Sequence, residues 1–263
     1  MNTPSARTVQ INGKGCRIQE AGQGETLTYL HGPFGIPKWT PFLEALSESR
    51  RVLALSLPGF PGSENGHHDL DNLTDWVMAT LDLLEAAGAD GSDVMGSSIG
   101  AMIAAEIAAT SRASVGRLIL AAPYGLYLDE DPIDNLWAKR SNKMFPAAVD
   151  NVDGLKELLA APAGLTNDDK VEWEIAQERA IVAGTRMCWP IAEFGLIKRL
   201  HRITQDTLIV WGANDRAIPP SYAKAFAAGI TGPVTLETVA DAGHLIDLDQ
   251  PARLAEVVSS WLG

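Results

Sequence analysis

The chain contains few of the residues that build disulfide-bonded or metal-centred proteins. Only two cysteines occur in 263 residues, and Cys16 and Cys188 are too far apart to form a metal or redox motif. We expect both to be reduced thiols, as is usual in the cytoplasm. The neighbouring His67 and His68 offer at most a weak surface metal site. A bound metal is therefore not expected.

Long apolar runs and positive charge are also scarce. The Ala-rich stretch 101–109 is interrupted by Glu106, and no run reaches the roughly 18 apolar residues of a membrane span. The first ten residues contain no apolar signal-peptide core, so we expect a cytoplasmic location. With 21 Lys and Arg against 33 Asp and Glu, the net charge of −12 disfavours binding to nucleic acid or an anionic membrane. We expect a small-molecule partner, with the chain a monomer or homodimer.

What is present is an apolar content of 46%, enough to bury one large core, and an alternation of strand and helix patterns. Asn12-Gly13 predicts a hairpin over residues 7–20. Helical periodicity and capping residues predict helices over 73–87, 100–110 and 251–262. Short apolar runs predict buried strands at 27–30, 52–57, 94–95, 118–122, 207–211 and 235–239. This order predicts an α/β fold with a mostly parallel sheet flanked by helices.

One segment interrupts the alternation. Between residues 124 and 203 no strand pattern occurs, and four prolines divide the segment into helical pieces. We interpret 124–203 as a helical cap inserted into a core made of residues 1–123 and 204–263. The alternative is an ordinary series of crossovers with one weak strand.

The strongest chemical signal is Gly96-Ser97-Ser98-Ile99-Gly100, between a predicted strand and a small-residue helix. A serine on such a sharp turn needs glycine two residues away on either side, because a Cβ there would collide. The turn places Ser98 at a helix N-terminus, where a backbone N–H can stabilise negative charge. Ser98 is the candidate nucleophile, and the Ile99 N–H is a candidate oxyanion donor. The offset of Ser97 from the two glycines does not suit the nucleophile role.

A serine nucleophile needs a base and an orienting acid. His244 follows the last predicted strand and is the best candidate base. Asp215 follows the predicted strand 207–211, at the same edge of the sheet. Three other carboxylates near His244 remain competitors for the acid: Asp241, Asp247 and Asp249.

The chain resembles the α/β-hydrolase family over nearly its whole length. The matching residues, in order, are His31-Gly32, Leu57-Pro58-Gly59-Phe60, the 96–100 motif, Trp211-Gly212-Ala213-Asn214-Asp215 and Gly243-His244. The resemblance implies an α/β-hydrolase fold with a helical cap, and acyl-enzyme chemistry by Ser98, Asp215 and His244. It also implies that no cofactor is needed.

One departure from the family pattern concerns the second oxyanion donor. The residue after His-Gly usually supplies it, but here that residue is Pro33, which has no N–H. Either Phe34 supplies the donor instead, or the loop follows a different path. For the substrate pocket we expect apolar side chains, mostly aromatic: Phe34, Trp39, Trp137, Met144 and Trp189.

The leading functional hypothesis is a serine hydrolase acting on a small carboxylic ester or thioester. One alternative keeps the triad and cleaves a C–C bond of an aromatic ring-cleavage product, or a lactone. A C–C hydrolase would need a cation for the substrate carboxylate, and the cap offers Arg140, Arg179, Arg186, Lys198 and Arg199 as candidates. A second alternative is a non-catalytic ligand-binding protein on a hydrolase scaffold.

Overall fold

A computed structural model of the chain describes residues 4–191 and 193–263. Eight strands form one sheet in the order β1-β2-β4-β3-β5-β6-β7-β8. The strands are β1 Ser5–Ile11, β2 Lys14–Ala21, β3 Thr26–Leu30, β4 Arg51–Leu55, β5 Asp93–Ser97, β6 Leu118–Ala121, β7 Thr207–Gly212 and β8 Val234–Val239. β1, β2 and β4 pair antiparallel, and every pair from β4 to β8 is parallel. The predicted α/β class and mostly parallel sheet are confirmed.

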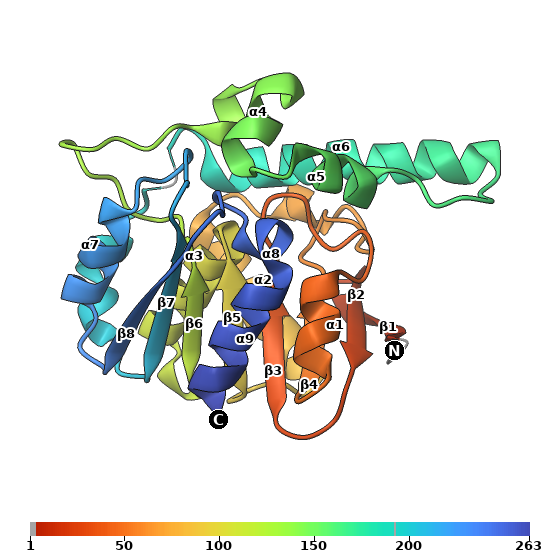
Figure 1. Ribbon diagram of the computed structural model, residues 1–263. Coiled ribbons are helices and arrows are strands. Elements are labelled where there is room, and N and C mark those ends of the chain that lie inside the picture. The colour runs from red at the N-terminus through yellow and green to blue at the C-terminus, as the bar shows by residue number, and fades with distance from the viewer. Residues whose placement is uncertain (1–3, 192) are drawn as a thin grey trace.

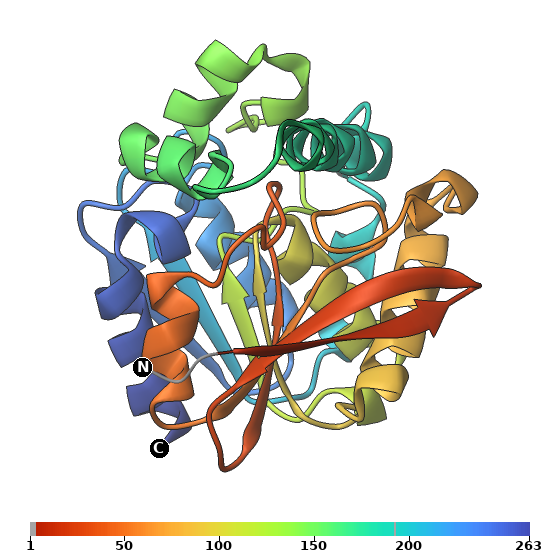
Figure 2. The same ribbon diagram turned by 90° about the vertical axis from the view of Figure 1, so that its right-hand side faces the viewer.

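Helices cover both faces of the sheet (Figures 1 and 2). On one face, α1 Pro41–Ser47 packs beside α9 Pro251–Leu262, with α8 Ile246–Asp249 next to them. On the other lie α2 Leu73–Ala87, α3 Ile99–Thr110 and α7 Ser221–Gly229. Because both faces are buried, the central strands are apolar throughout instead of alternating.

Local sequence explains the predicted elements well. Asn12 and Gly13 both adopt positive φ, 50° and 73°, as the tight turn of the β1–β2 hairpin requires. Asn72 begins α2 with a capping box to Asp75, and Gly88 ends it at φ 70°. Predicted and observed limits of this helix are the same.

Between β6 and β7 the described residues contain only helices and loops, apart from one isolated bridge between Gly125 and Glu193. The helices are α4 Ser141–Ala148, α5 Val152–Leu159 and α6 Asn167–Cys188, with short 3-10 turns at Leu136–Ala138, Leu196–Lys198 and Leu200–Arg202. α4, α5 and α6 lie above the carboxyl ends of the strands (Figure 1). We keep the name cap for this segment, and its exact boundaries stay a prediction.

The long helix α6 extends beyond the sheet at its N-terminal end (Figure 1). Its C-terminal part is buried against the core, whereas Val171, Ile175 and Val182 are about half exposed. No helix among the described residues is both long and apolar enough to cross a membrane.

Candidate active site

Ser98 occupies the turn between β5 and α3. Its backbone has φ 57° and ψ −115°, a region that residues other than glycine rarely adopt. A Cβ on Gly96 would collide with the backbone of Ala101, and one on Gly100 would collide with the carbonyl of Leu30. The two glycines therefore allow the strained turn, as the sequence motif indicated.

Ser98, His244 and Asp215 form a continuous hydrogen-bonded chain. Ser98 Oγ lies 2.8 Å from His244 Nε2, and His244 Nδ1 lies 2.9 Å from Asp215 Oδ2. With Nδ1–H donating to the Asp215 carboxylate, Nε2 is free to accept from Ser98. The side chains of Ser98 and His244 are fully buried. This arrangement can transfer the Ser98 proton to the imidazole.

The other oxygen of Asp215 is also held. Oδ1 accepts from the backbone N–H groups of Ala217 and Ile218, both at 2.9 Å. These bonds fix the carboxylate so that Oδ2 faces the imidazole.

The three competing carboxylates have other partners. Asp249 accepts from the N–H groups of Gly243 and Asn151, Asp247 accepts from two hydroxyls, and Asp241 occupies a turn with φ 53°. Asp215 is therefore the carboxylate that the structure joins to His244.

Two backbone N–H groups near Ser98 are candidate oxyanion donors. Ile99 is the first residue of α3, so its N–H has no acceptor within the helix. The turn from Gly32 to Gly35 is closed by Gly35 N donating to Gly32 O at 3.2 Å, and this bond does not use the N–H of Phe34. A Cβ built on Gly32 would lie 3.6 Å from Ser98 Cβ, so this turn lies beside the nucleophile, and the tighter approach of 3.1 Å would be to Leu245 Cδ2.

The predicted substrate-binding residues divide into two groups. Phe34, Trp137 and Met144 are buried in the apolar cluster that also holds Ile99 and Leu245, and the Phe34 ring packs edge-on against Phe145 of α4 at 5.5 Å. The structure does not bring the other two to the triad. Trp39 packs against the α1–α9 cluster and donates to Glu44, and Trp189 is 55% exposed beyond the end of α6.

Tyr124 contacts the triad and was missed by the sequence analysis. Its ring packs edge-on against the His244 ring at 5.4 Å, and its N–H donates to Ser98 O at 3.3 Å. Burial raises the pKa of its hydroxyl well above the usual range, so the hydroxyl stays protonated. The only sequence signal was its place directly after β6, where active-site loops gather.

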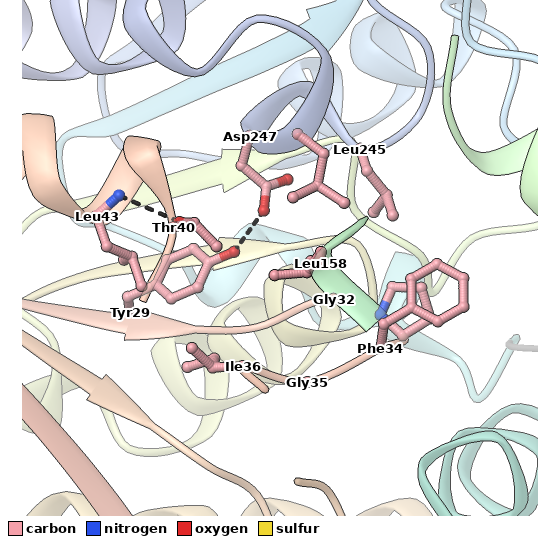
Figure 3. A pocket seen from close by; sticks show the side chains of 12 residues that line it. Tyr29, Gly32, Phe34, Gly35, Ile36, Thr40, Leu43, Leu158, Leu245 and Asp247 are labelled. Carbon is pink, nitrogen blue, oxygen red and sulfur yellow. Dashed lines mark hydrogen bonds between the residues drawn. The ribbon is translucent and has the colours of Figure 1, made fainter. Parts of the chain in front are cut away.

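A second buried network involves Ser97, the neighbour of the nucleophile. Ser97 Oγ donates to Asp247 Oδ1 at 3.0 Å. Tyr29 Oη donates to Asp247 Oδ2 at 2.8 Å, as Figure 3 shows. Burial raises the pKa of Asp247. Asp247 and Tyr29 line a cavity of about 20 Å³, room for roughly one water molecule, next to the loop that carries Phe34. The network joins β3, the Ser98 turn and the segment after His244.

His31 has a structural position. Its Nε2 accepts from the Leu57 N–H at 3.1 Å, so Nδ1 carries the proton and donates to Gly32 O at 2.8 Å. Burial lowers its pKa to about 4, which keeps the ring neutral. His31 thereby joins the turn from Gly32 to Gly35 to the loop after β4. Among residues 4–191 and 193–263, no three His, Cys, Asp or Glu side chains are grouped to hold a metal ion.

Comparisons with known proteins agree with this geometry. The chain is 24% identical over 276 residues to a 2-hydroxy-6-oxo-2,4-heptadienoate hydrolase of Pseudomonas putida, covering 100% of this chain and 98% of that protein. The structure superposes on a 2-hydroxy-6-oxo-6-phenylhexa-2,4-dienoate hydrolase from Rhodococcus with a TM-score of 0.77 and 17% identity, covering 100% and 99% of the two chains. It also superposes on naproxen esterase from Bacillus subtilis, with a TM-score of 0.76, 17% identity and coverage of 100% and 92%.

A family profile settles the wider assignment. The profile described as the alpha/beta hydrolase family matches residues 29–257, a span that includes the nucleophile turn and both of its hydrogen-bonded partners. The earlier resemblance is confirmed at this level, and the chain belongs to the alpha/beta hydrolase family.

Proposed function

We propose that the protein is a serine hydrolase that cleaves small, uncharged carboxylic esters or thioesters. The observation that carries this proposal is the Ser98–His244–Asp215 chain of hydrogen bonds beneath an apolar part of the cap. Ser98 Oγ attacks the substrate carbonyl while His244 Nε2 accepts the serine proton. The N–H groups of Ile99 and Phe34 hold the developing oxyanion.

The second half of the reaction uses the same groups. His244 donates its proton to the leaving alcohol or thiol as the tetrahedral intermediate collapses. A water molecule then attacks the acyl-enzyme, giving its proton to His244, and Ser98 leaves with that proton restored. No step needs a metal or an organic cofactor.

The cations of the cap support an uncharged substrate. Arg179 donates to the carbonyl oxygens of Gly59 and Ser63, and Arg199 forms an ion pair with Glu106. The remaining three of the five candidates are also directed elsewhere: Arg186 to Leu70 and Asp71, and Arg140 and Lys198 to solvent. Three of these five described side chains are thus bound to other groups, the other two are exposed, and none is hydrogen bonded to the triad.

The second candidate is a C–C bond hydrolase of ring-cleavage products. It is favoured by the names of relatives such as the Pseudomonas putida hydrolase, which shares 24% identity over almost the full length of both chains. The substrate in that name is a carboxylate. Because Arg179, Arg186 and Arg199 are bound to other groups and Arg140 and Lys198 are exposed, we place this candidate second. A lactone remains a further substrate class for the same triad.

The first test is labelling with a fluorophosphonate, comparing wild type with Ser98→Ala. We expect stoichiometric labelling of the wild type alone. Hydrolysis rates are then compared for three substrates: p-nitrophenyl butyrate, a neutral lactone and 2-hydroxy-6-oxo-hepta-2,4-dienoate. Consumption of the dienoate is measured by the loss of its absorbance. Faster turnover of the dienoate than of the ester would overturn the ester assignment. A folded wild type that is never labelled would instead favour the non-catalytic binding protein.

A further inference from the structure

Four residues flank the acid and the base of the triad. Three of them bind one short piece of the cap directly, and the fourth is joined to it through Asp249. We call residues 146–151, at the junction of α4 and α5, the anchor segment. Asn214 and Arg216 flank Asp215, whereas Gly243 and Leu245 flank His244. The loop after β7 and the loop after β8 are therefore both connected to the anchor segment.

On the acid side, both neighbours of Asp215 bind Asp150. Asn214 Nδ2 donates to Asp150 Oδ2 at 2.8 Å, and Arg216 Nη1 lies 2.7 Å from Asp150 Oδ1. The same guanidinium donates to the carbonyl oxygens of Pro146 at 2.7 Å and Val149 at 3.0 Å. The hydrogen bond from Asn214, together with Arg216, lowers the pKa of Asp150, which is therefore ionised at neutral pH.

On the base side, backbone groups make the contacts. Leu245 N donates to Ala148 O at 2.9 Å. Asp249 accepts from Gly243 N at 2.7 Å and from the N–H groups of Asp150 and Asn151 at 3.0 and 2.8 Å. One carboxylate thus joins the residue before His244 to the anchor segment.

The fit between these parts is close. A Cβ on Gly243 would lie 3.3 Å from Asp150 N and 3.4 Å from Val149 C, tighter than ordinary side-chain contacts. His244 and Asp215 make no hydrogen bond of their own to the anchor segment in the described chain. Any effect of the cap on the acid–base pair therefore passes through their neighbours.

We infer that the anchor segment of the cap aligns the Asp215–His244 pair, with Asp150, Arg216 and Asp249 as positioning residues. Ser98 and His244 are fully buried, so a substrate reaches them only after covering residues move, and on this inference the cap moves away from the core. Separation at the anchor segment releases both triad loops, and renewed contact returns them to the geometry for proton transfer. Closure over the substrate and alignment of the base are then one event.

A small displacement of the Asp215–His244 pair is enough to slow the reaction. A misplacement of about 1 Å can cost up to about 100-fold in rate, because proton transfer depends steeply on geometry. Arg216 and Asp150 are partly exposed, with side-chain exposures of 50% and 28%. Ion pairs at such positions add little to stability, so their loss should change turnover more than melting temperature.

The chain offers a matched control for Arg216. Arg186 also crosses between cap and core, donating to the Leu70 carbonyl and pairing with Asp71 in the segment before α2. We expect Arg216→Gln and Asp150→Ala each to lower kcat for p-nitrophenyl butyrate about tenfold or more, with KM changed less than twofold. Arg216→Lys, which keeps the charge, should recover part of the loss. Arg186→Gln should leave kcat within twofold of wild type.

Because the inference rests on the proposed function, a second measurement does not depend on turnover. The low-field proton NMR signal of the His244 Nδ1–H reports its hydrogen bond to Asp215. It should be present in wild type and Arg186→Gln, and be lost or broadened in Arg216→Gln and Asp150→Ala. Equal losses of kcat in Arg186→Gln and Arg216→Gln, or an unchanged signal in all variants, would overturn the inference. Absence of labelling and turnover in wild type would count against the proposed function, and the NMR comparison would still decide the alignment.

Discussion

Two adjacent serines at the end of β5 each hydrogen bond within a different buried network. Ser98 faces an imidazole that is backed by Asp215, whereas Ser97 donates directly to Asp247, which also binds Tyr29. Both serines and both carboxylates are buried. The difference lies in the imidazole. It can accept a proton from Ser98 and return it, whereas the Ser97 network has only donors bound to a carboxylate whose pKa is raised.

The comparison indicates that one network serves the reaction and the other stabilises the fold around it. The Ser98 network is arranged for proton transfer. The Ser97 network joins β3, the nucleophile turn and the segment after His244, and we expect it to contribute mainly to stability.

The largest contrast is expected between Ser98→Ala and Ser97→Ala. Loss of the nucleophile should lower kcat for p-nitrophenyl butyrate by on the order of 10⁶, with a small change in melting temperature. Ser97→Ala should keep kcat within about tenfold of wild type. It removes one donor from the buried Asp247 carboxylate and should lower the free energy of unfolding by about 1–3 kcal/mol. Calorimetry and kinetics on both variants would test this. Similar losses of kcat would end the distinction between the serines.

The two carboxylates should differ next. Asp215→Asn should reduce kcat by about 10⁴, because an amide favours the wrong imidazole tautomer. Asp247→Asn should reduce kcat less than about tenfold, since it breaks a single support hydrogen bond. Steady-state kinetics on matched samples decides between them. A larger loss of kcat from Asp247→Asn than from Asp215→Asn would show that Asp215 is not the acid of the triad.

Substitutions at Phe34 test how the two networks are connected. Tyr29 of the Ser97 network lies in β3, and β3 leads into the turn from Gly32 to Gly35 that contains Phe34. Phe34→Pro removes the N–H and should lower kcat by about 10²–10³. Phe34→Ala keeps the N–H and should lower kcat much less. The rate of fluorophosphonate labelling should follow the same order. Equal effects of the two substitutions would refute a backbone role for Phe34.

The smallest effect is a pH dependence of stability at Asp247. Burial raises the pKa of the folded carboxyl above its unfolded value of about 3.9. The folded state therefore binds the proton more tightly, and this contribution to stability is lost as the pH rises through the raised pKa. The melting temperature of wild type relative to Asp247→Asn should fall as the pH is raised from about 4. A constant difference from pH 4 to 7 would contradict the raised pKa.

Prediction from sequence succeeded where a local pattern determines the geometry. The glycines around Ser98, the capping box of α2 and the Asn12-Gly13 turn each act over a few residues, and the corresponding elements formed as expected. α1 was not predicted, because its seven residues are too few to show helical periodicity despite the cap at Thr40.

The long-range parts of the site could not be predicted in the same way. Asp247 and Tyr29 are 218 residues apart, and no spacing in the sequence connects them. Asp215 was one of several carboxylates until the structure placed it at His244 Nδ1. Trp39 and Trp189 were chosen by residue type, yet packing turned one to the α1–α9 cluster and the other to solvent.

The backbone conformation of Ser98 affects which substitutions at this position evolution would retain. A serine at φ 57° and ψ −115° is held in a conformation that costs of order 1–3 kcal/mol, whereas glycine adopts positive φ readily. A Ser98→Gly replacement would discard the nucleophile and at the same time relieve this strain. In a lineage where turnover no longer affected survival, drift at this position would favour a more stable, inactive protein. Serine at this position therefore gives up some stability of the folded state in return for a hydroxyl 2.8 Å from His244 Nε2.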